Sequence, residues 1–374
     1  MQDITLVLLA AGSASRFGAP TKKQWLYQGK KPLWLAVADS FQNSFNFSKS
    51  VIVCSPSEID YMKQFSNYLC VTGGNSREAS LRNALEHIDT PFVLVSDIAR
   101  CCVDVAMVER IIAKKKEAAC VVPSLKAVDT LYLDENPLDR DKVRMIQTPQ
   151  LSDTVLLKKA LKSTDSFTDE SSAIRAVGGT VLFVEGSARA HKLTTQEDLK
   201  RLPCLTPPSS ETLIGFGIDI HPFEENKIMK LCGITIDSPF GFKAHSDGDV
   251  AIHALIDALL GAAGMGDIGE LFPDTDKAYA GADSSILLQE VVKKIRAFGF
   301  EIINVDMTIL AQSPRLLPYK QAMKERIASL LGIVPIRTNI KATTAEKLGF
   351  VGREEGVTVH AVASLTYFNW KEVL

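Results

Sequence analysis

The chain of 374 residues lacks the features that mark several common protein classes. Its 42 Lys and Arg are balanced by 44 Asp and Glu, so it lacks the positive charge of a nucleic-acid-binding domain. No apolar run approaches the ~20 residues that span a bilayer, and the short run at 4–9 has no basic segment before it, unlike a signal peptide. The seven cysteines form no CxxC pair, so we expect reduced thiols rather than disulfides or a zinc knuckle. We therefore expect a cytoplasmic protein that binds neither nucleic acid nor membrane.

Two segments with different patterns are joined by a proline-rich stretch, and both indicate an α/β fold. In residues 1–203, short apolar runs alternate with segments of helical spacing, which predicts a mostly parallel sheet covered on both faces. Residues 125–147 interrupt this alternation with a turn signal, and we interpret them as a projecting β-arm of the kind that embraces a second subunit. Residues 204–211 have the composition of a linker, and residues 212–374 predict a second α/β (α+β) domain.

A loop of small residues directly follows the first expected strand. It begins Ala10-Ala11-Gly12 and leads to Arg16, with Lys23 shortly after. Small residues let backbone N–H groups approach a polyphosphate, and basic side chains add positive charge where negative charge builds up at phosphorus. The loop matches neither the GxxxxGK[ST] nor the GxGxxG pattern. Taken alone, it fits an ordinary turn with solvated basic residues as well as it fits a phosphate-binding loop.

Further polar motifs follow in the order typical of one enzyme family. In chain order they are Gly73-Gly74, Arg77, Asp97 at the end of an expected strand, Thr148, Thr168 and Lys192. An aspartate at the carboxyl end of a central strand is where open α/β sheets bind ligands, Mg²⁺ included. Over nearly all of residues 1–203 the sequence resembles the 2-C-methyl-D-erythritol 4-phosphate cytidylyltransferases, which implies a Rossmann-like nucleotidyltransferase domain.

That resemblance implies a reaction and a set of residue roles. A phosphate oxygen of methylerythritol phosphate would attack the α-phosphorus of CTP and release pyrophosphate, with Mg²⁺ as the cofactor. Arg16 and Lys23 match the residues that stabilise the transition state. The residues implied to position methylerythritol phosphate are Arg140, Lys192, Thr148 and Thr168. Those implied to bind the nucleotide and its metal are Ala10, Ala11, Gly12, Arg77, Ser80 and Asp97.

The first half departs from the family pattern at a few positions. The family has Pro-Lys-Gln where this chain has two additional residues, Thr21 and Lys22, before Lys23. Lys22 could therefore take the role of Lys23. The other departures are Ile98, Cys101 and His191. We expect these changes to affect the fine geometry and the rate more than the reaction.

The second half contains an aspartate and two histidines that could bind a metal ion. Asp219 and His221 lie two residues apart at the end of an expected strand, so their side chains share one face. His253 lies in an expected helix that Asp249 can cap, and Asp257, one turn later, could support the His253 ring. One carboxylate and two imidazoles suit Zn²⁺ or another divalent cation with one position left open. The Asp-x-His spacing alone is more often incidental than metal-binding.

Three longer strings in the second half resemble the 2-C-methyl-D-erythritol 2,4-cyclodiphosphate synthases. They are residues 244–263, 266–276 and 341–350, and the resemblance extends over residues 213–367. It implies that the 2-phosphate of CDP-methylerythritol 2-phosphate attacks the β-phosphorus and that CMP leaves. A metal ion on the Asp219, His221 and His253 side chains would orient the attacking phosphate.

The same resemblance implies roles for further residues of the second half. His245 and Ser246 would hold the diphosphate, and Thr344 would stabilise the charge of the transition state. Glu346 would bind a second cation, and its hard carboxylate oxygens suit Mg²⁺. The other implied ligand-binding residues are Asp267 and Gly269 for the ribose, Ala311, Arg315, Leu316 and Leu317 for the cytosine, and Thr343.

The resemblances also imply partners. Cyclodiphosphate synthases are trimers with sites shared between subunits, and the cytidylyltransferases dimerise, so we expect a homo-oligomer, a trimer or a hexamer. Phe350 and Arg353 match a segment of the trimer channel, where they could bind an isoprenoid diphosphate or simply pack at the interface. Because a kinase must phosphorylate the first product before the second reaction, we expect that kinase as a further candidate partner.

Two other functions stay open at the level of sequence. The chain could be a cytidylyltransferase for another polyol phosphate fused to a different metal-dependent phosphohydrolase. Alternatively, the second half could be a trimeric scaffold without an activity of its own.

Overall fold

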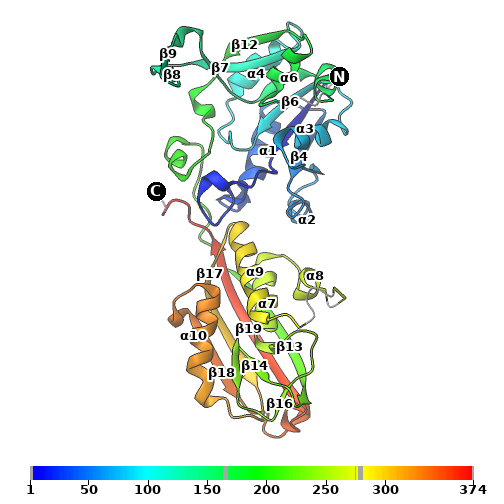
Figure 1. Ribbon diagram of the computed structural model, residues 1–374, viewed down its shortest axis with the longest axis vertical. Helices are drawn as coiled ribbons and strands as arrows, with labels where there is room; N and C mark the ends of the chain where they lie inside the picture. The colour runs from blue at the N-terminus through cyan, green and yellow to red at the C-terminus, as the bar shows by residue number, and fades with distance from the viewer. Residues whose placement is uncertain (1–2, 163–166, 274, 277–280, 373–374) are drawn as a thin grey trace. The chain divides into compact units, whose positions relative to one another are not determined.

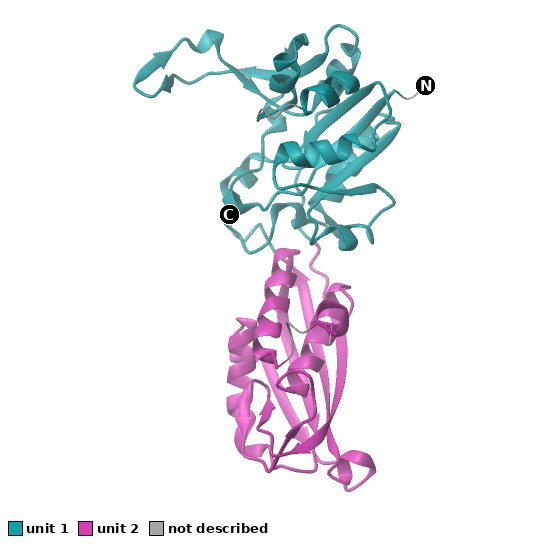
Figure 2. Cartoon of the chain, turned by 45° about the vertical axis from the view of Figure 1, so that its right-hand side comes forward, with its two compact units in different colours: residues 1–208, 369–374 teal, residues 209–368 magenta. Residues whose placement is uncertain are grey.

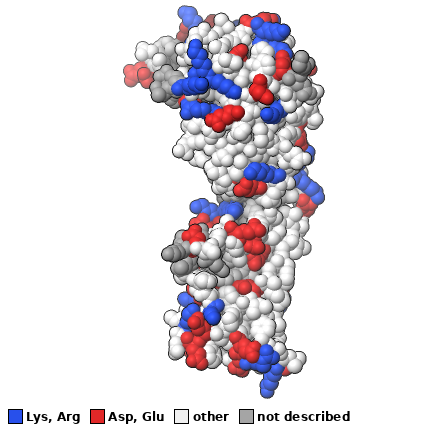
Figure 3. Space-filling model, turned by 90° about the vertical axis from the view of Figure 1, so that its right-hand side faces the viewer, with Lys and Arg blue, Asp and Glu red and all other residues white. Residues whose placement is uncertain are grey.

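The computed structural model describes residues 3–162, 167–273, 275–276 and 281–372. The chain divides into two compact units, unit 1 of Met1–Pro208 with Asn369–Leu374, and unit 2 of Ser209–Phe368 (Figure 2). Across the described ranges, no helix is long and apolar enough to cross a membrane. Both signs of charge occur on both units in the face that Figure 3 shows, consistent with the formal net charge of -2.

Unit 1 is built on one large sheet with helices on both faces (Figure 1). Its strands are β1 (Ile4–Leu9), β4 (Lys49–Cys54), β5 (Leu69–Thr72), β6 (Phe92–Asp97), β7 (Cys120–Lys126), β10 (Arg144–Ile146), β11 (Gln150–Asp153) and β12 (Val181–Glu185). The strand order is β10-β7-β11-β6-β1-β4-β5, with β12 beside β7. β10 and β11 run antiparallel to their neighbours, and the other pairs are parallel. The predicted, mostly parallel sheet is confirmed.

The helices of unit 1 form one layer on each side of that sheet. They are α1 (Leu33–Ser44), α2 (Ile59–Met62), α3 (Arg77–Leu85), α4 (Val105–Ala113), α5 (Thr154–Ala160) and α6 (Glu170–Ala176). Helices α3, α5 and α6 contact one another on one side, and α1 contacts α4. The core between α3, α5 and the sheet contains Val7, Val51, Val95, Leu81 and Leu157, all almost fully buried.

The predicted β-arm is present as a hairpin of β8 (Leu131–Leu133) and β9 (Asn136–Leu138). Its turn contains Asp134 with a φ of 53°, a left-handed conformation that Asp and Asn adopt more readily than most residues. Tyr132 and Leu133 on the arm are 63% exposed, and the arm extends away from the sheet (Figures 1 and 2). An arm with exposed apolar side chains suits contact with another protein surface.

The carboxyl edge of the unit 1 sheet is surrounded by tight turns. The loop after β1 leads into the 3-10 turns η1 (Ser15–Phe17) and η2 (Lys23–Trp25) and then into the short strands β2 (Tyr27–Gln28) and β3 (Lys31–Pro32). Helix α3 begins at the same edge, where the Ser76 side chain caps it by accepting from the Ala79 N–H at 3.0 Å. Gly73 is required just before it, because a Cβ there would lie 2.6 Å from Ala11 Cβ.

Two of the seven cysteines form a disulfide, which corrects the expectation of reduced thiols throughout. Cys102, in the loop before α4, is bonded to Cys204 near the end of the first segment of unit 1. The other five cysteines are free, and the sulfur of Cys101 lies within 4.8 Å of both bonded sulfurs. The partners are 102 positions apart, so no local spacing pattern could reveal the pair.

The last described residues pack on unit 1, although the sequence analysis assigned them to the second domain. Trp370 is 3% exposed, and its indole N–H donates to the Tyr27 carbonyl at 2.9 Å. A buried indole usually needs such an acceptor, so this contact fixes the segment in place.

Unit 2 has a five-stranded sheet with its long helices on one face (Figure 1). Its strands, in sheet order, are β16 (Phe240–Phe242), β13 (Leu213–Glu225), β19 (Gly356–Tyr367), β17 (Phe300–Leu310) and β18 (Thr338–Thr343). A separate hairpin pairs β14 (Met229–Leu231) with β15 (Ile234–Ile236). The helices are α7 (Val250–Ala263), α8 (Ile268–Leu271), α9 (Ser284–Ala297), α10 (Lys320–Leu331) and α11 (Gly349–Gly352).

Helix α7 packs directly on the backbone of β13. A Cβ on Gly217 would lie 2.0 Å from the Ala254 carbonyl oxygen, and a Cβ on Gly215 would lie 2.0 Å from that of Ala258. Only glycine permits this approach. The residues between and beside the two glycines face the other side of the sheet, where Ile214 is 70% and Phe216 is 59% exposed. One face of the sheet is therefore covered by helices, and the other presents apolar side chains to its surroundings.

We expect Gly217→Ala to destabilise unit 2 by about 3 kcal/mol, because the added methyl group overlaps the α7 backbone. Gly261→Ala is the matched control, since it lies in α7 with nothing within 4 Å of its Cβ position. It should stabilise the helix by about 1 kcal/mol. Calorimetric unfolding of the full chain measures both changes. Equal stability of the two variants would contradict the packing described for α7.

Candidate functional site

The small-residue loop after β1 borders a cavity that we call the loop cavity. It lies at the carboxyl edge of the unit 1 sheet, between this loop, the start of α3 and the end of β6. Nine of the residues to which the sequence analysis gave a role in the site line it: Ala10, Ala11, Gly12, Arg16, Lys23, Arg77, Ser80, Asp97 and Lys192. Residues that lie up to 182 positions apart, from Ala10 to Lys192, are thus gathered around one space.

Asp97 holds two of the cations of the loop cavity in place. Arg77 Nε donates to Asp97 Oδ1 at 3.2 Å, and Lys192 Nζ donates to Oδ2 at 2.6 Å. Arg77 also donates to the fully buried Glu170 at 2.7 Å. Burial favours the neutral form of Asp97, but the charges of Arg77 and Lys192 outweigh burial and hold the pKa of Asp97 below its usual value. The carboxylate is therefore ionised at neutral pH.

Only one of the two adjacent lysines faces the loop cavity. Lys23 lines it, with Nζ 3.4 Å from the Leu193 carbonyl oxygen, whereas Lys22 forms an ion pair with Glu58 and does not line the cavity. The structure thus separates the two candidates that the sequence left open. Burial lowers the pKa of Lys23, and the positive charges of Lys192 and Arg16 lower it further.

The four residues expected to position methylerythritol phosphate are not all brought together. Lys192 borders both the loop cavity and a neighbouring cavity, and Thr148 is buried with Oγ1 3.4 Å from the Asp97 N–H nitrogen. Arg140 instead follows the projecting arm, where its guanidinium donates to the Val128 carbonyl at 2.9 Å. Thr168 is exposed just before α6 and lines neither cavity. Within one chain, Arg140 lines neither cavity.

The neighbouring cavity also contains an ion pair that the sequence analysis did not identify. His191 Nε2 lies 2.7 Å from Asp198 Oδ1, and both residues line this cavity with Arg100. Burial raises the pKa of Asp198, but hydrogen bonds from His191 and the Thr195 backbone outweigh burial and leave that pKa well below its usual range. The spacing Thr195-x-x-Asp198 is a capping-box pattern and could have located this carboxylate.

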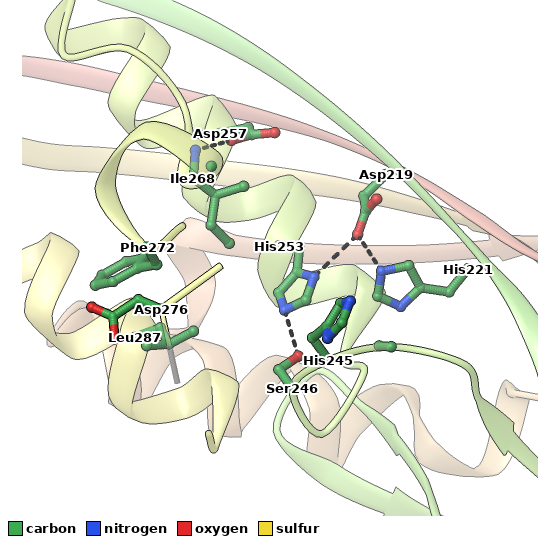
Figure 4. A pocket seen from close by; sticks show the side chains of 12 residues that line it. Asp219, His221, His245, Ser246, His253, Asp257, Ile268, Phe272, Asp276 and Leu287 are labelled. Carbon is green, nitrogen blue, oxygen red and sulfur yellow. Dashed lines mark hydrogen bonds and ion pairs between the residues drawn. The ribbon is translucent and has the colours of Figure 1, made fainter. Parts of the chain in front are cut away.

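In unit 2, the predicted metal-binding residues converge in a second pocket, which we call the histidine cavity (Figure 4). Asp219 and His221 extend from β13, and His253 extends from α7. Asp219 Oδ2 lies 3.0 Å from His221 Nε2 and 3.3 Å from His253 Nδ1. The three ligand atoms lie within 4.8 Å of one another, so this group could hold a metal ion.

The backbone contact of His221 leaves the other nitrogen of its ring facing Asp219. His221 Nδ1 lies 2.9 Å from the Gly248 carbonyl oxygen, which can only accept, so Nδ1 carries the hydrogen and Nε2 is free to be a ligand. Asp219 Oδ2 is buried and accepts no hydrogen bond from the described residues. Burial opposes the ionisation of Asp219, but the facing imidazoles outweigh burial and hold its pKa well below the usual range. Burial also lowers the pKa of His221, and contact with Asp219 raises it overall.

The supports of His253 differ in part from the expectation. Asp249 caps α7 as predicted, by accepting from the Ile252 N–H at 3.1 Å. Asp257 does not support the His253 ring, which is a correction, because its carboxylate accepts from the Ile268 N–H at 2.8 Å. Hydroxyl groups occupy that place instead: His253 Nε2 lies 3.0 Å from Ser284 Oγ and 3.2 Å from Ser246 Oγ. Ser284 begins α9 and was not identified from the sequence.

Of the residues expected to bind the diphosphate and the ribose, three line the histidine cavity and one does not. His245, Ser246 and Gly269 line the histidine cavity. Asp267 does not line it, because its side chain caps α8 by accepting from the Glu270 N–H at 2.9 Å. Asp267 is thus engaged in holding the short helix that carries Gly269.

The remaining predicted residues of unit 2 lie around the ends of β17 and β18. Asp219, Val359, Ile309 and Ala342 form one row across the sheet, and Thr343 follows Ala342 at the end of β18. Three strand spacings of ~4.8 Å separate Asp219 from Ala342, or about 14 Å. The residues on that side are Ala311, Arg315, Leu316, Leu317, Thr343, Thr344, Glu346, Phe350 and Arg353, none of which lines the histidine cavity. There Thr344 Oγ1 donates to Glu346 Oε1 at 2.7 Å, and Arg353 Nε donates to Glu355 Oε1 at 2.7 Å.

Known proteins match both halves of the chain. Residues 4–204 match the family model of 2-C-methyl-D-erythritol 4-phosphate cytidylyltransferase, and residues 212–366 match that of the YgbB family. The chain is 65% identical over 372 residues to the bifunctional enzyme IspD/IspF of Sulfurovum sp. (strain NBC37-1), with 100% of both chains covered. It is 55% identical over 373 residues to that of Sulfurimonas denitrificans, covering 100% of this chain and 97% of the relative.

A solved structure extends this similarity to the fold. The bifunctional IspDF from Campylobacter jejuni matches with a TM-score of 0.93 and 48% identity, covering 99% of this chain and 100% of that one. Because single relatives match both halves in the same order, the leading functional prediction is confirmed over its two alternatives. The chain belongs to the bifunctional IspD/IspF enzymes and carries the cytidylyltransferase and cyclodiphosphate synthase activities of the methylerythritol phosphate pathway to isoprenoids.

Proposed function

We propose that the loop cavity binds CTP with Mg²⁺, and that Arg16 and Lys23 neutralise the charge that develops on the α-phosphate. The observation that carries this proposal is the convergence of Arg16, Lys23 and Lys192 on a cavity bordered by the backbone at Gly12. Asp97 is an ionised oxygen donor at the same cavity, which suits Mg²⁺, an ion bound through one or two carboxylates together with substrate phosphates. Mg²⁺, when bound there, would neutralise phosphate charge.

Methylerythritol phosphate is proposed to bind where the loop cavity meets the neighbouring cavity. Lys192 borders both, so it can hold the second substrate next to the α-phosphate of CTP. Thr148 lies beside the Asp97 backbone, within reach of the same place. Arg140 and Thr168 lie elsewhere in a single chain, and we propose that the arm of a second copy supplies Arg140.

The basic limb of the cytidylyltransferase pH profile should report Lys23. The pKa of Lys23 is lowered from the usual value of 10.5, so Lys23 should lose its proton at a lower pH than an ordinary lysine. The value of kcat/KM for CTP should fall as the pH rises through that range. Lys23→Arg should move the limb to higher pH, because a guanidinium keeps its proton. Lys23→Met should lower kcat/KM by about 100-fold or more. Pyrophosphate release measures these effects, with the exposed Lys114→Met as control. An unmoved limb in Lys23→Arg would contradict the role.

The Asp219, His221 and His253 group is proposed to hold Zn²⁺, with one position open for a substrate phosphate oxygen. One carboxylate and two imidazoles are the donor set of catalytic zinc sites, and the Gly248 carbonyl fixes the His221 tautomer that leaves Nε2 free. His245 and Ser246 line the same cavity and can hold the diphosphate. Zn²⁺, when bound, supplies Lewis-acid stabilisation of the phosphate charge.

Loss of either type of ligand should remove the metal ion and one of the two activities. Asp219→Asn and His253→Ala should each lose the bound ion, as measured by plasma mass spectrometry, and lower CMP release about 100-fold or more. Pyrophosphate release by unit 1 should stay unchanged in the same samples, and His87→Ala, an exposed imidazole of unit 1, should keep one ion per chain. A full equivalent of metal in His253→Ala would refute the assignment.

A second copy of the chain is proposed to complete the cyclodiphosphate synthase site. The histidine cavity and the β17–β18 end lie about 14 Å apart in one subunit, at the same level of the sheet. Thr344 and a Mg²⁺ ion at Glu346 would then act on substrate held at the metal site of a neighbour. The backbone of Ala311–Leu317 would bind the cytosine, and Phe350 and Arg353 would face the channel of a trimer.

The uncovered face of the unit 2 sheet is the proposed interface of that trimer, and the arm of unit 1 would link trimers into a hexamer. The face consists of β13 side chains that alternate with the buried glycines, and its residues are Ile214, Phe216, Ile218 and Ile220, each at least 46% exposed. Contiguous apolar surface of this kind marks an interaction site.

Phe216→Asp should therefore prevent trimer formation, because a carboxylate in an apolar interface would be desolvated without a partner. We expect a smaller species in sedimentation velocity and at least a tenfold loss of CMP release, with pyrophosphate release retained. Ile336→Asp is the control, since Ile336 is 83% exposed on a 3-10 turn, η8 (Pro335–Arg337), away from β13. An unchanged sedimentation coefficient for Phe216→Asp would contradict the interface.

The kinase of the intermediate step is also proposed as a partner. Its support is chemical: the product of the first reaction must be phosphorylated before the second site can use it. Co-sedimentation of the two proteins at cellular concentrations tests this proposal, and separate migration would count against it.

A further inference from the structure

A buried carboxylate lies behind the turn that carries Lys23. Glu58, just before α2, has a side chain that is 0% exposed, and it forms an ion pair with Lys22. Gln24 Nε2 and Trp25 Nε1 each donate to Glu58 Oε2 at 3.1 Å. Three of four consecutive side chains thus converge on one carboxylate, and Lys23 is the exception.

Lys23 points the other way, toward the loop cavity, with Nζ 3.4 Å from the Leu193 carbonyl oxygen. In a 3-10 turn, successive side chains are about 120° apart, so neighbouring side chains cannot all face one group. Fixing Gln24 and Trp25 on Glu58 therefore fixes the direction in which Lys23 leaves the turn.

The same carboxylate is connected to the loop that borders the cavity. Gln24 Nε2 also lies 3.2 Å from the Gly12 carbonyl oxygen, so one amide group joins Glu58 to the small-residue loop. Trp25 is held on its other side by aromatic rings, with its ring centroid 5.3 Å from that of Tyr61 and 5.7 Å from that of Phe65. The turn is therefore fixed by hydrogen bonds at one side and by packing at the other.

We propose that Glu58 is a positioning residue for the cytidylyltransferase, which retains Lys22 outside the loop cavity and selects Lys23 as the lysine that enters it. Glu58 does not line the cavity and acts only through the turn. The inference rests on the proposed contact of Lys23 with CTP. It explains why Lys22 and Lys23, which the sequence alone leaves as equal candidates for contact with a phosphate, are not equivalent in the fold.

A purely structural ion pair would predict something different. Removing one partner of a buried pair leaves an uncompensated charge and destabilises the fold, but it need not change the rate of the molecules that stay folded. The test must therefore measure the rate per folded unit 1, and the fraction of unit 1 that resists limited proteolysis supplies that normalisation.

The decisive variants are Glu58→Gln and the double variant Lys22→Met with Glu58→Gln. In Glu58→Gln, Lys22 loses its anionic partner and can compete for the triphosphate, so kcat/KM for CTP should fall at least tenfold per folded unit. CMP release by unit 2 should not change. In the double variant neither charge remains, Gln24 and Trp25 keep an acceptor, and kcat/KM should return to within threefold of the parent.

Asp3→Asn is the matched control, because it removes another part-buried ion pair of unit 1, between Asp3 and Lys115, away from the cavity. Lys23→Met is measured in parallel. If Lys23→Met keeps the parental rate, the proposed role of Lys23 is wrong. If Lys23→Met is inactive while Glu58→Gln behaves like Asp3→Asn, the role of Lys23 stands and the inference about Glu58 is overturned.

A measurement on the unmodified enzyme covers the case in which Glu58→Gln does not fold. Acylation of amines, read by peptide mass spectrometry, should modify Lys23 readily without CTP and slowly with CTP. Lys22 should react slowly under both conditions, because it is engaged with Glu58. Protection of Lys22 by CTP would show that Lys22 enters the cavity, and that result would overturn the proposal.

Discussion

The close approach of helix α7 to strand β13 is the constraint on which the grouping of Asp219, His221 and His253 in unit 2 depends. Gly215 and Gly217 bring the helix backbone against the strand backbone. The next inward-facing positions of the same strand are Asp219 and His221, and His253 lies on the first turns of the helix. A wider spacing between helix and strand would separate the imidazole of His253 from the carboxylate of Asp219. The glycines thus help to bring the three side chains together although neither of them has a side chain.

In unit 1 the corresponding constraint is electrostatic. Several cations lie close together around the loop cavity, where burial lowers the pKa of Lys23 and the positive charges of Lys192 and Arg16 lower it further. Asp97 and the buried Glu170 offset the repulsion among these cations by pairing with Arg77 and Lys192. Preorganised charge of this type is the main contribution that a protein can make to phosphoryl transfer, where little covalent chemistry falls to its side chains.

Much of the architecture could be predicted from sequence because local patterns determine it. Alternating apolar runs predicted the sheets, a turn signal predicted the arm, and Asp249 was correctly predicted to cap α7. The grouping of Asp219, His221 and His253 followed from strand periodicity together with resemblance to a family. The direction of Lys22 could not be predicted, because it depends on Glu58, which lies 36 positions away and belongs to no motif. The same reason hid the Cys102–Cys204 disulfide and the contacts of Ser284 with His253. The prediction that Asp257 supports the His253 ring was wrong. The spacing of one helical turn does not reveal that the Ile268 N–H donates to the Asp257 carboxylate.

The packing of Trp370 on Tyr27 makes unit 1 discontinuous along the chain, with all of unit 2 encoded between its two segments. During synthesis, the last piece of the first structural unit leaves the ribosome only after the whole of the second has been translated. The nascent cytidylyltransferase domain must therefore persist without the indole that later covers the Tyr27 backbone. Unit 1 therefore closes only after the residues of unit 2 have been synthesised.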